Sequence, residues 1–396
     1  MKANEGLRPP LEGIRVIDRT DEYGAYAGRL LAGLGAEVIR VIDGVEEQPG
    51  DKAHHSQSVT RQGMFDEFVN AGKKSVTLET APRGERALEK LVESADIVLS
   101  SSSGRAPGDW LGVNPKVVHV VMTPFGWGLS PEFGPVDDLI VLGSGGLLHL
   151  GGYPDIGPVG AYGNQSQIAC GIFGAVAALV GLIERHHTGK GNYADVSAQE
   201  AIAQALEDHL PTYVLTGEVK GPHGERAREA GTGLYACADG YVSMVAGRLG
   251  TARAWASLVD WLTGEYNDGA ELAEAAWSDF AFRQTDHASA RFRELFEGFA
   301  ADRTKNELYQ EAQRRGIALS PVSDVGDLLE NEQLASRGFF HRFHHRRLDC
   351  DVSLPGPPFQ FSNNSLPALE EAPDEGEDTR AILRELGLTD AATKTT

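Results

Sequence analysis

The chain has 396 residues, of which 41% are hydrophobic and 23% are charged, and its formal net charge at pH 7 is −21. That length is sufficient for two domains with buried cores. A surface this negative repels nucleic-acid phosphates and anionic lipids, so we expect neither nucleic acid nor a membrane as a partner. The three cysteines, Cys170, Cys237 and Cys350, stand far apart without a CxxC pair, so the sequence predicts no metal site and fits a reducing, cytoplasmic location.

Short apolar runs alternate with helical patterns through the first third of the chain. This alternation is typical of βαβ units and predicts an α/β fold with a doubly wound parallel sheet. The turn after the first strand reads RTDEYG (residues 19–24) and lacks the GxGxxG fingerprint, so the fold class alone indicates no dinucleotide cofactor. Strands are predicted at residues 14–18, 37–42, 75–78, 95–99 and 117–122, and helices at about 27–34 and 83–94.

A glycine-rich block at residues 143–163 leads into an apolar helix at about 168–187. The uncharged part of this helix is short for a membrane span, so we expect a buried helix with Cys170 as an inert core residue. The later elements are a strand at 192–197, a hairpin about Asp239-Gly240, helices to about residue 316, linkers at 354–359 and 370–378, and a last helix at about 379–386.

In so acidic a protein, a small anionic ligand needs a local cluster of positive groups. Arg40 lies in an otherwise apolar predicted strand, and Lys73 and Lys74 stand next to another. Together with Arg61 and Arg105 they either form a positive patch or are ordinary solvated surface charges. Spacing alone leaves both readings open.

Several segments match one known family in order, from about residue 10 to 388. They are residues 10–18, 28–41, 70–78, 154–159, 188–197, 234–242, 333–339 and 355–361. On these segments the chain resembles the family III CoA-transferases of the CaiB/BaiF type. The resemblance implies a Rossmann-like large domain with a parallel sheet, a smaller α+β domain and an interlocked dimer. The expected division is a large domain at 1–205, a linker at 206–230, a small domain at 231–330 and a return to the large domain at 331–396.

The resemblance also implies a substrate and a binding surface. Members of this family act on CoA thioesters and carboxylic acids, so coenzyme A is expected as part of the substrate, with no separate cofactor. The positions that match the family's CoA-binding region are Arg40, Lys73 and Lys74, with Arg105 in a segment whose register differs by about two residues.

The chain departs from the family pattern at residue 167. The resemblance places the family's nucleophilic aspartate there, where this chain has Gln167. In the family mechanism a carboxylate attacks the acyl thioester to give a mixed anhydride and free CoA thiolate. A carboxamide is a far poorer nucleophile, although it still donates a hydrogen bond to a carbonyl. The racemase branch pairs the aspartate with a histidine, whose position is Asp137 here, so Asp137 is either a lone candidate base or a helix N-cap.

Three functions follow from this pattern. The first is the nucleophile-free subunit of a heteromeric CoA-transferase that moves CoA between acids, for example from succinyl-CoA, with an acid-bearing homologous chain as its partner. The second is a self-sufficient homodimeric CoA-transferase or acyl-CoA isomerase or racemase that uses Asp137, Asp138 or Asp155. The third is a non-catalytic acyl-CoA binding protein. The acyl pocket is expected to be lined by residues 143–163, the start of the apolar helix and the partner chain.

Overall fold

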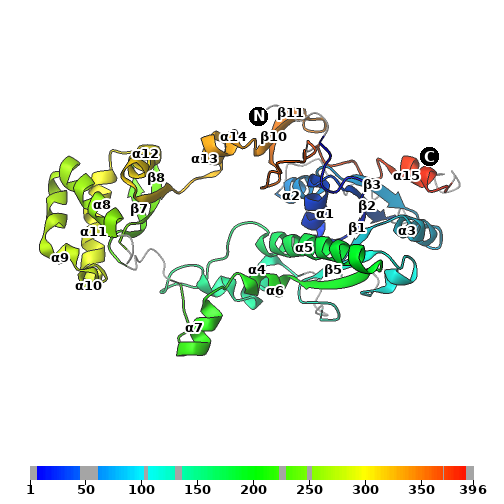
Figure 1. The fold of residues 1–396 in the computed structure, drawn as a ribbon, viewed down its shortest axis with the longest axis horizontal. Helices are drawn as coiled ribbons and strands as arrows, with labels where there is room; N and C mark the ends of the chain where they lie inside the picture. The colour runs from blue at the N-terminus through cyan, green and yellow to red at the C-terminus, as the bar shows by residue number, and fades with distance from the viewer. Residues whose placement is uncertain are drawn as a thin grey trace. The chain divides into compact units, whose positions relative to one another are not determined.

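The computed structural model describes residues 7–44, 61–101, 106–129, 136–222, 229–247, 252–368 and 370–388. The chain divides into two compact units (Figure 1). The first comprises Met1–His149, Gly160–Lys220 and Gln333–Thr396, and the second comprises Leu150–Val159 and Gly221–Glu332. The first unit is therefore assembled from both ends of the chain. The domain boundaries expected from the sequence stay a prediction; the segment 206–230 contains a helix, α7 (His209–Thr216), that groups with the first unit.

A six-stranded, all-parallel sheet forms the centre of the first unit. Its strands follow the spatial order β3 (Lys74–Leu78), β2 (Glu37–Asp43), β1 (Arg15–Arg19), β4 (Ile97–Ser100), β5 (Val118–Thr123), β6 (Asn192–Ser197). The expected doubly wound α/β fold is confirmed. Strand order reverses between β1 and β4, because β2 and β3 extend to one side of β1 while later strands extend to the other. In such sheets the carboxyl ends of the strands at the reversal point flank the ligand crevice.

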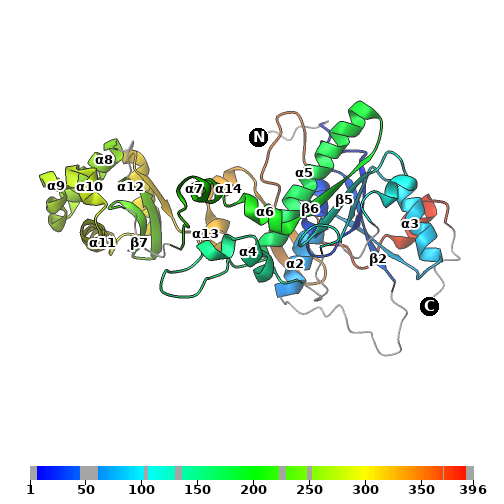
Figure 2. The same ribbon diagram turned by 90° about the horizontal axis from the view of Figure 1, so that it is seen from below.

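Helices cover both faces of this sheet. Val16, Val38 and Ile97 contribute to one core, against α1 (Ala25–Gly33) and α5 (Gln165–Thr188). Their strand neighbours Ile17 and Ile39 belong to the opposite core, against α3 (Arg83–Glu93) and α15 (Thr379–Glu385). Figures 1 and 2 show α1 and α5 together on one face and α3 and α15 together on the other. Successive strand residues point to opposite faces, so a strand covered on both sides is apolar along its whole length.

Glycines let α5 approach its neighbours closely. A Cβ added at Gly171 would lie 2.8 Å from Cβ of Tyr26 on α1, and one at Gly174 would lie 2.2 Å from Sδ of Met122 on β5. By length and composition alone α5 is able to cross a membrane. Its glycine face is instead packed against α1 and β5, as expected for a core helix. The other face leaves several apolar side chains exposed, namely Ile172, Phe173, Val176, Val180 and Ile183.

The carboxyl-terminal segment closes the edge of the sheet at β3. The backbone N–H of Ser75 donates to the Asp378 carboxylate at 2.9 Å, and the N–H of Thr77 donates to Oγ1 of Thr379 at 3.0 Å. The N–H of Asp378 donates in return to the carbonyl of Ser75 at 2.9 Å. Residues 370–378 form no helix or strand, as expected of a linker, but the end of this segment also satisfies edge groups that would otherwise be unpaired.

The remaining elements complete the two units. In the second unit the expected hairpin is present as β7 (Thr232–Cys237) and β8 (Gly240–Val245), and β9 (Ala318–Pro321) extends it to an antiparallel sheet. Aromatic side chains such as Tyr235, Trp261 and Phe296 fill its core. The helices of the second unit are α8 (Ala252–Glu265), α9 (Ala275–Ser278), α10 (Phe280–Arg283), α11 (Asp286–Ala300), α12 (Lys305–Arg315) and α13 (Val325–Glu330).

The first unit also holds α2 (Arg61–Asn70), α4 (Asp138–Ser144), α6 (Ala198–Gln204), α14 (Glu332–Ser336) and a hairpin of β10 (Phe340–His345) and β11 (Cys350–Pro355). Residues 354 and 355 thus belong to a strand, which corrects the expected linker at 354–359.

Candidate functional site

The turn between β1 and α1 lies at the reversal point of the sheet and is held by buried polar contacts. Oδ1 of Asp18, at the end of β1, accepts the N–H of Thr20 at 3.0 Å and its hydroxyl at 2.6 Å. The N–H of Asp21 donates to Oγ of Ser101 at 2.9 Å, which connects this turn to the end of β4. A hydrogen bond therefore connects the chain segments that follow β1 and β4, the two strands at the reversal point.

Lys73 stabilises the same turn through hydrogen bonds of its side chain. Its ammonium group is fully buried and donates to Oδ2 of Asp18 at 2.7 Å, to the carbonyl of Ala25 at 2.8 Å and to Oδ1 of Asn70 at 3.1 Å. Burial lowers the pKa of Lys73, and the neighbouring Asp18 carboxylate opposes that shift. Gly28 leaves the space for this pair, since a Cβ there would lie 2.3 Å from Oδ2 of Asp18. All three donors of Lys73 are used inside the protein, which gives this residue a structural role.

Two neighbouring carboxylates hold the starts of α4 and α5. Asp137 is the N-cap of α4 and accepts the N–H of Leu139 at 2.9 Å. Oδ1 of Asp138 accepts the N–H and the hydroxyl of Ser166, in the first turn of α5, at 2.7 and 2.6 Å. The structure therefore places Asp137 as a helix cap, the second of the two readings that the sequence left open. The third acidic candidate, Asp155, is exposed and belongs to the second unit.

Gln167 follows Ser166 in the first turn of α5, and a carboxylate stands against it. Gln167 is only 4% exposed, and its Nε2 donates to Oε2 of Glu22 at 2.8 Å. Oε1 of Gln167 is buried and has no hydrogen-bond partner within the described residues. Glu22 itself lies in the β1–α1 turn and is exposed. An amide from α5 and an acid from the reversal point of the sheet thus meet at one place.

Glu22 is not among the site residues that the sequence predicts. The signal was present in the RTDEYG turn, which places two consecutive acids directly after the first strand of a doubly wound sheet. What the sequence does not show is that α1 packs on α5, which brings residue 22 to residue 167.

Other reactive side chains near this place are unsuited to nucleophilic attack. Cys170 lies one turn after Gln167, fully buried, and burial raises the pKa of its thiol to about 12. The thiol therefore stays protonated near neutral pH, in line with the expectation of an inert core cysteine. Tyr23 donates its hydroxyl to the carbonyl of Val136 at 2.9 Å, and burial raises its pKa as well.

A polar cavity of about 420 Å³ adjoins the start of α5. Its lining comes from the beginning of α4 and from the approach to α5, namely Asp137, Asp138, Leu139, Leu142, Ala161, Gly163 and Asn164. The last three lie in or next to the glycine-rich block that the sequence analysis expects to form the acyl pocket. Among the described residues, no three of His, Cys, Asp and Glu are grouped so as to hold a metal ion.

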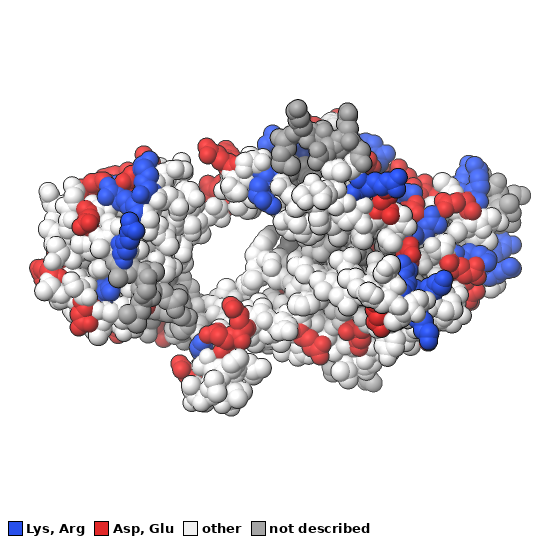
Figure 3. Space-filling model, in the orientation of Figure 1, with Lys and Arg blue, Asp and Glu red and all other residues white. Residues whose placement is uncertain are grey.

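The basic residues expected to bind CoA have different surroundings. Arg40 is half-buried in β2, with its backbone in register with Asp18 of β1 and Ser75 of β3. Lys74 is exposed and pairs with Glu37 at 2.5 Å, while Arg105 lies outside the described residues. On the face shown in Figure 3, basic side chains are interleaved with acidic ones. The CoA-binding role of Arg40, Lys73, Lys74 and Arg105 stays a prediction, and the ammonium group of Lys73 already has three partners inside the protein.

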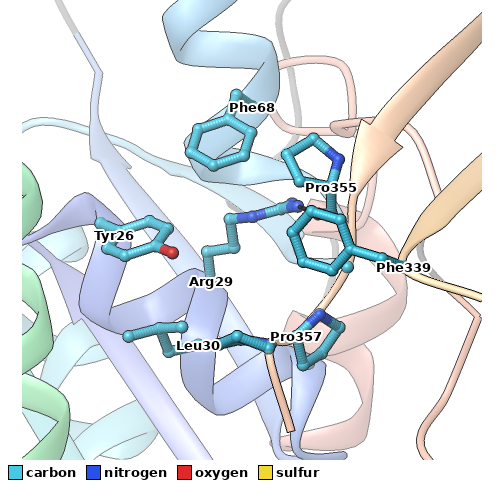
Figure 4. A pocket seen from close by; sticks show the side chains of 10 residues that line it. Tyr26, Arg29, Leu30, Phe68, Phe339, Pro355 and Pro357 are labelled. Atoms are coloured by element: carbon cyan, nitrogen blue, oxygen red, sulfur yellow. Dashed lines mark hydrogen bonds between the residues drawn. The ribbon is translucent and has the colours of Figure 1, made fainter. Parts of the chain in front are cut away.

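A second, smaller cavity surrounds a buried arginine. Tyr26, Phe68, Phe339 and Pro357 lie around the guanidinium of Arg29 (Figure 4). Nη2 of Arg29 donates to the carbonyl of Pro355 at 2.6 Å, and the guanidinium carbon lies 4.3 Å from the centre of the Phe68 ring. Burial lowers the pKa of Arg29 to about 10. These contacts attach the end of β11 to α1, so this arginine helps to bring the two ends of the chain together.

Comparison with known proteins gives a consistent result. The family model described as CoA-transferase family III matches residues 11–379. The chain is 33% identical to the succinyl-CoA:(R)-benzylsuccinate CoA-transferase subunit BbsE of Thauera aromatica, covering 94% of this chain and 93% of that protein. It is 24% identical to the succinyl-CoA–L-malate CoA-transferase beta subunit of Chloroflexus aurantiacus, covering 96% and 95%. Among solved structures, a CaiB/BaiF family protein from Brucella suis superposes with a TM-score of 0.79 at 22% identity, covering 96% of this chain and 100% of that one.

Proposed function

This chain belongs to CoA-transferase family III, and we propose that it works as one subunit of a heteromeric enzyme that moves CoA from succinyl-CoA to an organic diacid. CoA-transferases use CoA thioesters as substrates. The heteromeric part of the proposal is supported by relatives that are themselves named as subunits, in Thauera aromatica and in Chloroflexus aurantiacus. An aryl-substituted succinate is the acid class we favour, because the Thauera relative acts, by its name, on (R)-benzylsuccinate.

The observation that carries the proposal is the buried amide at residue 167. A carboxamide forms no anhydride with an acyl group under mild conditions, so residue 167 accepts no acyl group. Its role is to bind: the amide lies in the first turn of α5 and donates to a neighbouring acceptor, as it would to a thioester carbonyl. Position 167 is therefore nucleophile-free, and a homologous partner chain supplies a carboxylate at its own corresponding position.

An exchange assay tests this proposal even while the acceptor acid is unidentified. Labelled succinate is incubated with succinyl-CoA and the purified chain, alone and together with each family III chain encoded beside it. Incorporation of label into succinyl-CoA that requires a partner chain supports the heteromeric enzyme. Brisk exchange by the chain alone identifies a self-sufficient transferase instead, and CoA-ester binding without exchange in any combination identifies a non-catalytic binding protein.

A further inference from the structure

We infer that the carboxylate of Glu22 accepts the acyl group in this chain's own site, the task that residue 167 cannot perform. The inference rests on the proposed function, because it requires a CoA thioester as substrate. It adds to that function a covalent step on this chain, in addition to any carboxylate that a partner supplies.

Glu22 has the position in the fold that a residue acting on a bound ligand requires. Glu22 lies in the turn that follows β1, at the reversal point of the sheet, where ligands of doubly wound folds bind. The turn is rigid, because the buried Asp18–Lys73 pair and the contact between Asp21 and Ser101 fix it on both sides. A nucleophile needs to be held in place by its surroundings in this way.

Glu22 is exposed to solvent, whereas Gln167 beside it is buried. Gln167 is 4% exposed, so a thioester carbonyl that approaches from solvent meets Glu22 before it meets the amide. Gln167 donates to Oε2 of Glu22, and the Glu22 residue as a whole is exposed. The carboxylate is thus oriented by the amide and belongs to a solvent-accessible residue. The positive end of the 24-residue helix α5 lies beside the pair and favours the negative charge that develops during attack.

The other acids described near residue 167 hold helix starts or turns in place. Asp137 caps α4, and Asp138 accepts two hydrogen bonds from Ser166. Oδ1 of Asp21 accepts the N–H of Tyr23 at 3.0 Å. Of the acids described around residue 167, Glu22 is the one in direct contact with the amide, and its carboxylate holds no helix start or turn in place.

The chemistry balances without an additional reactant. An oxygen of Glu22 bonds to the thioester carbonyl carbon, and the carbon–sulfur bond breaks with its electron pair on the CoA thiolate, which gives a mixed anhydride. The thiolate attacks Cδ of Glu22, and the first acid leaves as a carboxylate that carries one oxygen from Glu22. The second acid attacks the resulting glutamyl thioester and releases the thiolate again. The thiolate then takes the second acyl group, and Glu22 leaves as a carboxylate with one oxygen from the second acid.

That oxygen transfer provides the test. The active preparation, with a partner chain where one is needed, is incubated with succinyl-CoA and succinate carrying ¹⁸O in its carboxylates. Cleavage after Arg19 and Arg29 releases residues 20–29, and fragmentation then separates a label on Asp21 from one on Glu22. We expect ¹⁸O on Glu22. An active preparation that places the label only on another carboxylate, of this chain or of the partner, overturns the inference and leaves the proposed function standing.

Matched variants distinguish a nucleophile from a structural residue. Glu22→Gln keeps a side chain that hydrogen-bonds to Gln167, and it is expected to lose the label from this peptide. The exchange variant Glu22→Gln/Gln167→Asp restores one acid and one amide in reversed positions, and the label is expected to move to residue 167. Glu85→Gln, at an exposed position of α3 on the opposite face of the sheet, is the control and keeps the label on Glu22. Glu22→Gln that still takes up ¹⁸O on another residue of this chain at the wild-type level contradicts the inference, whereas absence of exchange in every combination contradicts the proposed function itself.

Discussion

Lys73 and Lys74 are adjacent in the sequence and lie in opposite surroundings. The ammonium group of Lys73 is buried and bound to Asp18, whereas that of Lys74 is exposed and bound to Glu37. Removal of one member of a buried ion pair leaves the other charge without compensation, which costs about 3–5 kcal/mol. An exposed pair contributes about 1 kcal/mol or less.

Substitution of each lysine by methionine separates these roles. We expect Lys73→Met to lower the free energy of unfolding by about 3–5 kcal/mol, and Lys74→Met to lower it by less than about 1 kcal/mol, measured by urea unfolding. If Lys74 also binds the phosphates of CoA, the Lys74→Met variant keeps its stability and binds CoA esters more weakly in calorimetry. Equal losses of stability in the two variants would show that the buried pair is not what holds the β1–α1 turn.

His119 makes the stability of the first unit depend on pH. It is fully buried on β5, its Nδ1 accepts the N–H of Gly108 at 3.2 Å, and its Nε2 lies 2.8 Å from Oγ of Ser100. Nδ1 is therefore unprotonated and Nε2 carries the proton. Burial lowers the pKa of His119 from 6.5 to about 4.

Between pH 6.5 and about 4, His119 is protonated in the unfolded chain and not in the folded one, so folding stability falls as the pH falls through this range. The full effect is about 3 kcal/mol. We expect His119→Gln, which has no titrating group there, to show a flatter loss of stability over this range than the wild type, whatever its stability at pH 7. Parallel acid profiles from chemical unfolding would contradict this account.

At the scale of elements, the packing of α5 depends on its glycines. Gly174→Ala adds a Cβ about 2.2 Å from Sδ of Met122, so β5 or α5 must shift. We expect a loss of about 1–3 kcal/mol in thermal or urea unfolding. Gly264→Ala in α8 is the control, because nothing lies within 4 Å of the added Cβ, and alanine in a helix is expected to stabilise by about 0.5–1 kcal/mol. A neutral Gly174→Ala would show that the α5–β5 contact is not tight.

The elements that sequence predicts well are those with a strong local pattern. The apolar runs at 14–18 and 37–42 correspond to β1 and β2 with shifts of a residue or so at their ends, because a buried parallel strand is apolar along its length. Helix α2 was missed because its sequence, RQGMFDEFVN, shows little apolar periodicity. Strand β10 has the sequence FHRFHH, whose polar residues obscure the apolar pattern typical of a strand, so the hairpin was not predicted. The contact of Glu22 with Gln167 was missed because it joins residues 145 positions apart through the packing of two helices.

At the scale of the whole molecule, one side of α5 is apolar and exposed. Val176 and Val180 are 49% and 57% exposed, and Ile172 and Ile183 lie on the same face. Apolar patches of this kind on a protein surface are typically covered by another chain. The interlocked dimer implied by the family resemblance stays a prediction, and this face is where we expect burial on assembly.

Charges on this face are expected to weaken assembly. The double variant Val176→Asp/Val180→Asp places two carboxylates where a partner chain would pack, and we expect light scattering after gel filtration to show a smaller mass than for the wild type. His187→Asp, at an exposed position near the end of α5, is the control and keeps the wild-type mass. A wild-type protein that is already monomeric, or a double variant of unchanged mass, would contradict this expectation.

The covering of β3 by the last residues has a consequence for biosynthesis. The central sheet is nearly complete once β6 has left the ribosome, but Ser75 and Thr77 find their hydrogen-bonding partners only when Asp378 and Thr379 emerge. Most of the second unit, Gly221–Glu332, is translated in between, so it has time to fold while the β3 edge of the first unit is still unpaired. A nascent chain with this edge unpaired can bind another copy of the chain through it. A stop codon shortly before position 378 should therefore yield a product that aggregates, rather than one that only lacks its last residues.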